Sequence, residues 1–267
     1  MTLYLIRAKE CCMLKNERQQ QILDMLHANG YVEISELTKI FNVSSMTVCR
    51  DLEELEYAGK LIRSRGGALL TDTNALVERP FNTRQIDNQS QKCAIADAAL
   101  NTIEDGLRLF FGPGSTVWSL AQKLDNSRRL MIVTDAINIS NELVSRPAVS
   151  VVQIGGEVRQ NTLSTVGTFA EEMIRKFKCQ HAYIGVTGIG SDGTLYVTSV
   201  AEAGLFRIVF EISSKAFILA DYSKIGKEDF VAIGKLQPGY TLITDPQAPK
   251  DIIEYYESLG VNVIIAQ

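Results

Sequence analysis

The chain has 267 residues, of which 46% are apolar and 22% are charged, and its formal net charge is −4. This composition is typical of a globular protein, and the acidic balance excludes a broadly basic surface for nucleic acid, so any DNA-binding site must be a local patch. The sequence has neither an apolar run of about 18 residues nor a secretory signal, so we expect no membrane span and a cytoplasmic location.

The chain is expected to begin with an N-terminal extension, residues 1–14, in which Met13 is a candidate second translation start. The first predicted helix runs from about Glu17 to Ala28, where apolar residues recur at spacings of three and four. The pair Asn29-Gly30 is expected to end this helix, because both residues are common at helix C-termini.

A second, short helix is predicted from Ile34 to Phe41, with its apolar residues on one face. Glu33 stands at its start, where Ser or Thr would be a better hydrogen-bond acceptor. After a turn at Asn42-Val43, Ser44 is expected to cap a third helix by accepting a backbone N–H from its first turn.

The third helix has two contrasting faces. Val48, Leu52 and Leu55 recur at helical spacing and are predicted to pack on the first two helices. The opposite face holds Met46, Arg50, Glu53 and Tyr57, with Thr47 and Cys49 on its flanks.

The next segment, Leu61–Leu70, reads as two short strands around the sequence R-G-G. Three helices followed by a hairpin constitute a winged helix-turn-helix, whose helix-turn-helix covers about Val32 to Asp51. The third helix would then enter the major groove of DNA, and the hairpin would reach the backbone or the minor groove. A small domain with an ordinary polar surface is the alternative interpretation. The candidate DNA-binding residues are Ser44, Ser45, Met46, Thr47, Cys49, Arg50, Arg63 and Arg65.

The predicted DNA-binding domain, residues 15–70, has only a modest number of basic residues. It contains seven lysines and arginines against eight acidic residues. One such module should bind DNA weakly, and we therefore expect a symmetric homo-oligomer, a dimer or a tetramer, in which two modules bind double-stranded DNA together.

Residues 71–90 are polar with one proline and are predicted to be a linker.

In residues 91–267, short apolar runs rich in β-branched residues alternate with helical patterns such as Lys92–Ile103 and Ser115–Leu124. This alternation predicts an α/β domain with a mainly parallel sheet. The apolar runs, which are the predicted strands, cover 107–111, 130–133, 149–154, 182–186, 216–220, 242–243 and 261–266.

Several of these runs are followed by loops rich in glycine, hydroxyl and charged residues. In G-P-G-S-T, residues 112–116, the glycines would let the backbone approach a phosphate, and Ser115, Thr116 and the following helix N-terminus would donate hydrogen bonds to it. Loops after parallel strands meet at one edge of the sheet. Tight turns and helix capping are the alternative explanations. The candidate effector-binding residues are Gly112, Gly114, Ser115, Thr116, Asp135, Gly155, Gly156, Arg159, Gly188, Asp221 and Lys224.

The sequence offers little scope for a metal or disulfide site. Its five cysteines, Cys11, Cys12, Cys49, Cys93 and Cys179, are odd in number and form no C-x-x-C pair. The two histidines, His27 and His181, lie far apart in sequence. We therefore expect no disulfide framework, no metal site and no cofactor.

The helix-turn-helix segment resembles the DeoR family of bacterial transcriptional regulators. The residues that carry the resemblance are Ser44, Thr47, Val48, Arg50, Asp51 and Leu52, followed by Gly66-Gly67. The chain departs from the family pattern at Cys49, where arginine is usual, and at Ser64-Arg65, where a basic or histidine pair is common.

The large domain is also similar to the sensor domain of this family, whose fold resembles ribose-5-phosphate isomerase and CoA transferases. The resemblance implies a repressor of a carbohydrate-metabolism operon that a phosphorylated sugar or related metabolite releases from its operator. Gly112 and Asp135 depart from the usual Asp and Asn, which implies different contacts to the sugar. The matching motifs are Ile95-Ala96, Ile103 with Gly106, G-P-G-S-T at 112–116, Thr134-Asp135, G-G-E-V-R at 155–159, G-V-T-G-I at 185–189 and D-Y-S-K-I-G at 221–226.

Two alternatives to a ligand-responsive repressor stay open on the sequence. A sugar-phosphate isomerase of the same fold would need a carboxylate base and a lysine, for which Glu202 and Lys224 are candidates. The isomerase motif D-G-A-D is missing, since the matching loop reads G-V-T-G-I-G-S-D, so we expect no enzymatic activity. The other alternative is an activator without a small-molecule effector.

Overall fold

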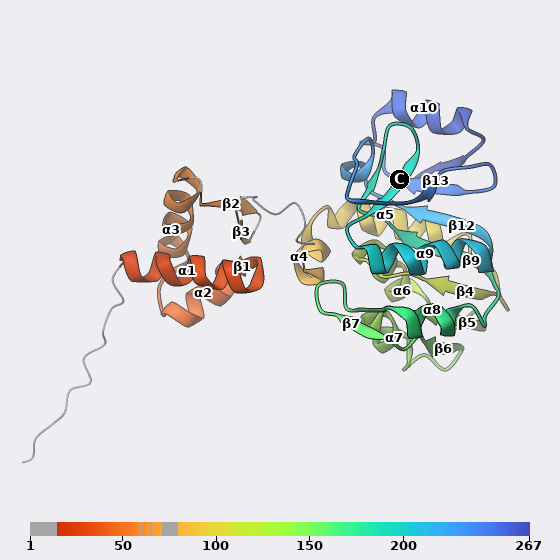
Figure 1. Ribbon diagram of the computed structural model, residues 1–267, viewed down its shortest axis with the longest axis horizontal. Helices are drawn as coiled ribbons and strands as arrows, with labels where there is room; N and C mark the ends of the chain where they lie inside the picture. The colour runs from red at the N-terminus through yellow and green to blue at the C-terminus, as the bar shows by residue number, and fades with distance from the viewer. Residues whose placement is uncertain (1–14, 59, 65, 71–79) are drawn as a thin grey trace, which may run out of the picture. The chain divides into compact units, whose positions relative to one another are not determined.

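The computed structural model describes residues 15–58, 60–64, 66–70 and 80–267. The chain divides into two compact units, Met1–Arg79 and Pro80–Gln267, which are described separately (Figure 1). The predicted N-terminal extension, Arg65 and residues 71–79 of the predicted linker lie outside the described residues. No helix of the described part is both long enough and apolar enough to cross a membrane.

The described part of the first unit contains three helices, α1 (Lys15–Asn29), α2 (Ile34–Phe41) and α3 (Ser45–Tyr57). Their inward residues form one core, and the predicted inward face of α3 is confirmed: Val48, Leu52 and Leu55 are buried. The predicted helix starts are also confirmed, since Glu33 makes no side-chain cap bond to α2 and Ser44 caps α3.

A three-stranded antiparallel sheet completes this unit, in the order β1 (Tyr31–Glu33), β3 (Gly67–Leu70), β2 (Leu61–Ser64). The β2–β3 hairpin is the predicted one, whereas β1 has only three residues and no alternating pattern that would predict it. Gly67 pairs with Glu33, and a Cβ on Gly67 would lie 2.1 Å from the Val32 carbonyl oxygen. The pairing of β1 with β3 therefore requires glycine at position 67.

The second unit is built on a seven-stranded sheet in which every pairing is parallel. All seven apolar runs of the sequence are strands of this sheet, which confirms the predicted α/β fold. The strands, in spatial order, are β15 (Asn262–Ile265), β14 (Thr241–Thr244), β12 (Ser213–Leu219), β9 (Cys179–Gly185), β4 (Arg108–Phe111), β5 (Leu130–Thr134) and β6 (Val149–Gln153).

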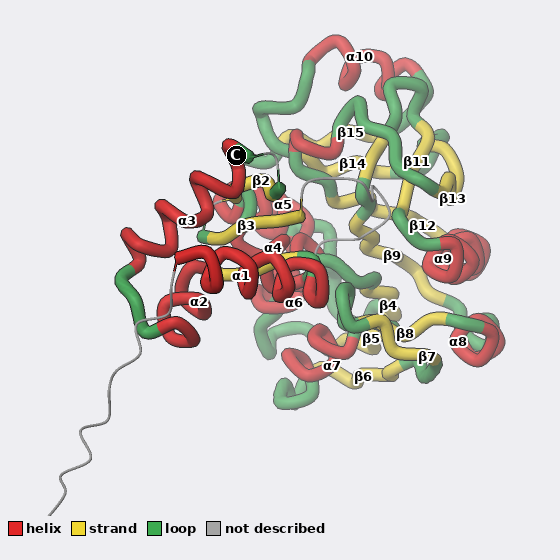
Figure 2. The backbone as a smooth tube through the Cα atoms, turned by 60° about the vertical axis from the view of Figure 1, so that its left-hand side comes forward, coloured by secondary structure: helices red, strands yellow, loops and turns green. Residues whose placement is uncertain are grey.

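Helices cover both faces of the sheet (Figures 1 and 2). On one face, α5 (Gln89–Leu100), α6 (Ser115–Lys123) and α7 (Ile137–Leu143) contribute buried residues to a common core with the strands. On the other face, α8 (Thr168–Ile174), α9 (Val200–Ile212) and α10 (Lys250–Ser258) do the same. This is the three-layer arrangement of α/β proteins with a parallel sheet.

The strand order reverses in the middle of this sheet. From β4 the chain builds β5 and β6 on one side, and then crosses to β9, β12, β14 and β15 on the other side. Ligands of such sheets bind at the carboxyl ends of the strands where the order reverses. In this protein that point lies between β4 and β9.

Smaller elements surround this edge. They are the hairpin β7 (Glu157–Arg159) and β8 (Ser164–Val166), the 3-10 helix η1 (Tyr222–Lys224), and a small sheet of β10 (Gly188–Ile189), β11 (Thr194–Val197) and β13 (Val231–Lys235).

The predicted linker 71–90 extends too far. Residues 81–86 form the helix α4 (Phe81–Ile86), α5 begins at Gln89, and the second unit starts at Pro80. Phe81 is buried and its ring contacts the Trp118 ring edge-to-face, with centroids 5.7 Å apart. One aromatic residue in a polar stretch thus fixes this segment to the domain, which the polar composition did not predict.

Candidate functional sites

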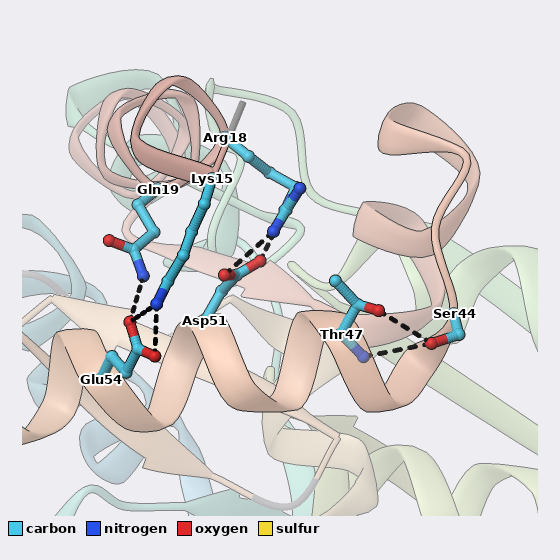
Figure 3. Close-up of polar contacts among 7 residues, drawn as sticks. All are labelled: Lys15, Arg18, Gln19, Ser44, Thr47, Asp51 and Glu54. Carbon is cyan, nitrogen blue, oxygen red and sulfur yellow. Dashed lines mark hydrogen bonds and ion pairs between the residues drawn. The ribbon is translucent and has the colours of Figure 1, made fainter. Parts of the chain in front are cut away.

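The first candidate site is the start of α3. Ser44 precedes the helix, and its Oγ accepts a hydrogen bond from the Thr47 backbone N–H at 3.2 Å and lies 2.9 Å from Thr47 Oγ1 (Figure 3). Ser45, Met46 and Arg50 are exposed, while Thr47 and Cys49 are half-buried on the flanks. The cap fixes the first turn of α3, so these side chains form one solvent-facing surface with a defined backbone.

The hairpin β2–β3 is tied to the second half of α3 through Arg63. Its Nη1 lies 2.6 Å from Glu53 Oε1, and its backbone N–H donates to Glu56 Oε1 at 2.8 Å. Arg63 was expected to face DNA, but here it is ion-paired with an acidic residue of α3. A DNA phosphate would have to replace the Glu53 carboxylate to bind this guanidinium. The other basic residue expected on the wing, Arg65, lies outside the described residues.

Arg18 and Asp51 form a buried ion pair between α1 and α3 (Figure 3). The Arg18 side chain is 9% exposed and the Asp51 side chain 2%. Arg18 is one of the seven basic residues of residues 15–70, and its burial leaves it unavailable for contact with DNA. No local pattern predicts this pair, because the two residues are 33 positions apart.

The second candidate site lies at the carboxyl edge of the parallel sheet. Gly112 follows β4, and its backbone N–H donates to the Tyr183 carbonyl of β9 at 2.9 Å. Gly114 caps α6 with φ at 132°, a conformation that favours glycine. A Cβ on Gly185 would lie 3.4 Å from the Pro113 carbonyl oxygen. The loops after β4 and β9 therefore approach each other closely where the strand order reverses, beside Ser115 and Thr116 in the first turn of α6.

The β7–β8 hairpin connects the loops that follow β5 and β6. Thr165 donates its backbone N–H to the Asp135 carbonyl at 2.9 Å and its hydroxyl to the Ile154 carbonyl at 2.6 Å. Arg159 of the same hairpin forms an ion pair with Glu202 in the first turn of α9, with Nη1 3.1 Å from Oε2. The hairpin thus brings Asp135 and Arg159, which sequence reasoning had assigned to one site, to the same edge.

Asp135 has an unusual environment. Its side chain is fully buried, and neither carboxyl oxygen has a hydrogen-bond partner among the described residues. Burial and the nearby Glu202 carboxylate raise the pKa of Asp135 well above its usual value, and Arg159 opposes this shift only partly. Both causes disfavour the charged form, so the carboxyl group is held toward its neutral state.

The loop after β12 carries Asp221 and Lys224. Asp221 is buried, and its Oδ1 accepts hydrogen bonds from the Ser223 backbone N–H and from Asn88 Nδ2, both at 3.0 Å. The capping alternative for Asp221 therefore holds, because it caps η1. Sequence reasoning missed Asn88, since this residue fell in the predicted linker.

Lys92, on α5, is a second residue that sequence reasoning missed. It is 5% exposed, and its ammonium group donates hydrogen bonds to the carbonyls of Arg84 and Asp87. Burial lowers the pKa of Lys92 to about 8, while the Asp221 carboxylate raises it and Lys224 lowers it further. The signal that could have identified Lys92 is its place on the buried face of a helix, because lysine is almost never fully buried unless its charge is satisfied.

Two of the candidate glycines are explained by local packing. A Cβ on Gly156 would lie 2.5 Å from the Val166 carbonyl oxygen, and one on Gly188 would lie 2.5 Å from the Lys227 carbonyl oxygen. The tight-turn alternative therefore accounts for Gly156 and Gly188 without a ligand. Gly155 donates its backbone N–H to the Met173 sulfur at 3.4 Å, and a Cβ at this position would meet no atom within 4 Å.

Two further features of the described residues concern metal sites and hollows. No group of three or more His, Cys, Asp or Glu side chains within the described ranges is arranged to hold a metal ion. An open hollow lies at the opposite, amino edge of the sheet, between β4, β5 and β6, and Arg108 and Arg129 line it. Arg129 is paired there with Asp105 at 3.0 Å, and ligands of parallel sheets bind at the carboxyl edge, so we assign no ligand to this hollow.

Comparison with known proteins identifies both units. Residues 18–74 match the model of the DeoR-like helix-turn-helix domain, and residues 87–246 match the model of the DeoR C terminal sensor domain. The chain belongs to the DeoR family. As a member of this family it is a DNA-binding transcriptional regulator and not an enzyme, which decides against the isomerase alternative.

Full-length relatives of this DeoR-family chain are named as regulators. It is 29% identical over 242 residues to the glycerol-3-phosphate regulon repressor of Escherichia coli (strain K12), covering 91% of this chain and 95% of that protein. It is 32% identical over 251 residues to the HTH-type transcriptional regulator YulB of Bacillus subtilis (strain 168), covering 94% and 96%. It is 32% identical over 248 residues to the lactose phosphotransferase system repressor of Staphylococcus epidermidis, covering 91% and 98%.

A solved structure similar to the DeoR-family chain is ribose 5-phosphate isomerase A from Methanocaldococcus jannaschii. The TM-score is 0.40 at 15% identity, and the match covers 52% of this chain and 55% of that one.

Proposed function

We propose that this DeoR-family regulator is a repressor of a carbohydrate-metabolism operon, released from its operator by a phosphorylated sugar or a related metabolite. The observation that carries the proposal is the set of donors at the carboxyl edge of the parallel sheet. There the N-terminus of α6, with Ser115 and Thr116, adjoins the point where the strand order reverses. The names of the relatives support it, since two are repressors of a glycerol-3-phosphate regulon and of a lactose phosphotransferase system.

A phosphate would bind at the first turn of α6. Backbone N–H groups at a helix N-terminus are not used within the helix, and the helix dipole favours an anion there. Gly112 and Gly114 add no side chains of their own to this turn, and Ser115 and Thr116 add hydroxyl donors. Arg159 and Lys224 are the cations that we assign to the same site.

Asp135 would contact the sugar rather than the phosphate. A charged carboxylate close to a phosphate would repel it. Because burial and Glu202 hold the Asp135 carboxyl toward its neutral form, that repulsion is weakened. A neutral carboxyl group both donates and accepts hydrogen bonds, as the amide of asparagine does. Asp135 is therefore suited to bind a hydroxyl group of the effector.

Operator DNA would bind to the capped end of α3 and to the β2–β3 hairpin. Met46 and Arg50, on the exposed face of α3, would contact base edges and phosphates, with Ser44, Ser45, Thr47 and Cys49 beside them. Arg63 and Arg65 would contact the backbone or the minor groove. Because the unit has few basic residues, we propose a homo-oligomer, a dimer or a tetramer, that places two such units on one operator in the cytoplasm.

The two halves of this proposal are tested together by a ligand panel and a DNA-binding assay on the full chain. Thermal unfolding is measured with ribose 5-phosphate, glycerol 3-phosphate and glucose 6-phosphate, since a ligand at 100 times its dissociation constant stabilises a protein by about 2.7 kcal/mol. Operator affinity is then measured with and without the stabilising compound. A compound that stabilises the protein and weakens DNA binding supports a repressor with an effector, and a broad panel without any such compound contradicts it.

A further inference from the structure

Helix α4 is the first element of the second unit after the DNA-binding unit, and it is too short to be stable alone. It has six residues, and isolated helices shorter than about 12 residues are marginal in water. Its order must come from contacts with the rest of the domain. Figure 1 shows it as the yellow-orange helix at the start of this unit.

The N-terminal end of α4 makes two contacts. The Phe81 backbone N–H donates to the Asn161 carbonyl at 2.8 Å, and the Phe81 ring packs edge-to-face on Trp118. Asn161 lies in the turn between β7 and β8, two residues after Arg159. Trp118 lies in α6, three residues after Ser115 and two after Thr116. Both partners therefore belong to the elements that carry the proposed phosphate site.

The C-terminal end of α4 is also held by contacts with the rest of the domain. Lys92 donates hydrogen bonds to the Arg84 and Asp87 carbonyls, with 2.6 Å to the latter, which satisfies acceptors at the end of the helix. Asn88, the next residue along the chain, donates to Asp221 Oδ1 at 3.0 Å. Asp221 in turn begins the loop that carries Lys224.

We propose that α4 is a strap that couples occupancy of the effector site to the chain segment leading to the DNA-binding unit. The strap is defined here as residues 80–88, with Asn88 and Lys92 as its positioning residues. The inference rests on the proposed function, because the three anchors of the strap are elements of the proposed effector site. A ligand that moves α6, the β7–β8 turn or the Asp221 loop changes the contacts of a helix that has no stability of its own. The order of residues 80–88 then increases or decreases at the point where the second unit begins.

The strap itself is tested without any ligand, on the full-length chain. Asn88→Ala and Lys92→Met each remove contacts at the C-terminal end. Asn262→Ala and Lys235→Met are matched controls, whose hydrogen bonds to Thr241 and Asp192 lie elsewhere in the same unit. Trp118 is the only tryptophan of the chain, so acrylamide quenching of its fluorescence reports on the opposite, N-terminal end of the strap. Hydrogen exchange of residues 80–88 reports on the whole strap.

Asn88→Ala loses one hydrogen bond, worth about 1 kcal/mol, and should raise hydrogen exchange of the amides of residues 81–88 about fivefold. Lys92→Met loses two hydrogen bonds and should raise it at least as much. Trp118 should become more accessible to acrylamide in the same variants, and neither control should change. If exchange rises only next to position 88 while residues 80–84 and Trp118 stay unchanged, the two ends are independent and the strap proposal is overturned.

The link to ligand binding is tested with ribose 5-phosphate and, as a second probe, inorganic phosphate. In the wild-type chain, protection of residues 112–118 by a probe should be accompanied by a change in exchange of residues 80–88. In Asn88→Ala and Lys92→Met, residues 112–118 should still be protected, while residues 80–88 should no longer respond. Protection of 112–118 without any response of 80–88 in the wild type overturns the strap and leaves the proposed function standing. If neither probe protects 112–118, the effector proposal fails for these probes, and the ligand-free experiment still decides the strap.

Discussion

The guanidinium group of Arg18 in α1 and the carboxylate of Asp51 in α3 form a two-point ion pair inside the first unit (Figure 3). Nε lies 2.5 Å from Oδ2, and Nη2 lies 3.1 Å from Oδ1. Three residues further along α3, Glu54 pairs with Lys15 of α1 at the surface, where the two side chains are 44% and 50% exposed. The two pairs join the same helices in different environments, so they allow a direct comparison of buried and exposed charges.

Breaking the buried pair should be costly. Asp51→Ala leaves the Arg18 charge buried without this partner, which we expect to lower the free energy of unfolding by about 3–5 kcal/mol. Urea denaturation of the full chain, followed by far-UV circular dichroism, measures the effect. Glu54→Ala is the matched control and should leave the unfolding midpoint nearly unchanged, because exposed pairs are weak. If both variants lose the same free energy of unfolding, burial does not determine how strongly the Arg18–Asp51 pair stabilises the protein.

The ion pair between Arg63 and Glu53 should limit DNA binding. In Glu53→Gln the Arg63 guanidinium can bind a phosphate without first leaving a carboxylate, so we expect tighter operator binding. The salt dependence of the affinity should steepen by roughly one unit, because one more phosphate is neutralised. Glu17→Gln, an exposed position on α1, changes the net charge equally and serves as control. Equal effects of both substitutions would mean that net charge, and not the pair, is responsible.

Cys49 stands on the flank of the proposed DNA-reading surface, where the DeoR family usually has arginine. Its thiol cannot make the charged contacts to phosphate or guanine that arginine makes. We expect Cys49→Arg to tighten DNA binding and to steepen its salt dependence by roughly one unit. Fluorescence anisotropy with a labelled operator at several salt concentrations measures both quantities, and Cys49→Ser, which adds no charge, should leave the slope unchanged. An unaltered affinity and slope in Cys49→Arg would place position 49 outside the DNA contact.

The features that the sequence predicted are those with a local pattern. The seven strands are short apolar runs, and α3 combines a Ser cap with apolar residues at helical spacing, so each is visible within a few neighbouring residues. The missed features depend on distant partners or on very short elements. β1 has three residues, and the bond from Asn88 to Asp221 spans 133 positions. No local periodicity encodes such contacts, which is why the predicted linker extended into α4.

The candidate effector residues also divide into features that a local pattern predicts and features that depend on distant partners. The strand-end rule predicted that Ser115, Thr116 and Asp135 follow strands at the carboxyl edge of the sheet, where the structure has them, because a parallel sheet brings the ends of its strands together. It did not distinguish ligand contacts from packing, and Gly156 and Gly188 are accounted for by close backbone contacts alone. Nor did it predict Glu202 as the partner of Arg159, since the pair forms between a hairpin and a helix 43 positions apart.

The carboxyl group of Asp135 should make stability depend on pH in one direction. Its pKa is raised in the folded chain, so the folded state keeps a proton that the unfolded state releases above about pH 4. The wild type should therefore lose stability relative to Asp135→Asn as pH rises from about 4 toward the folded pKa. Urea midpoints of both proteins between pH 4 and 8 measure this difference. A constant difference over that range would mean that Asp135 is charged in the folded protein.

Lys92 should give the opposite dependence at alkaline pH. Its pKa is lowered from 10.5 to about 8 in the folded chain, so between these values the folded state has released a proton that the unfolded state still holds. Stability therefore rises with pH across this window, and the wild type should gain up to about 3 kcal/mol relative to Lys92→Met, since one pKa unit corresponds to about 1.4 kcal/mol. Urea midpoints from pH 7.5 to 10.5 measure the gain. Lys235 is the control, because the Asp192 carboxylate raises its pKa and its charge is favoured throughout the window. If the urea midpoints of the wild type and of Lys92→Met change in parallel with pH, the hydrogen bonds to the Arg84 and Asp87 carbonyls keep the ammonium group charged in spite of its burial. The end of α4 is then held by a cation at every pH in the window.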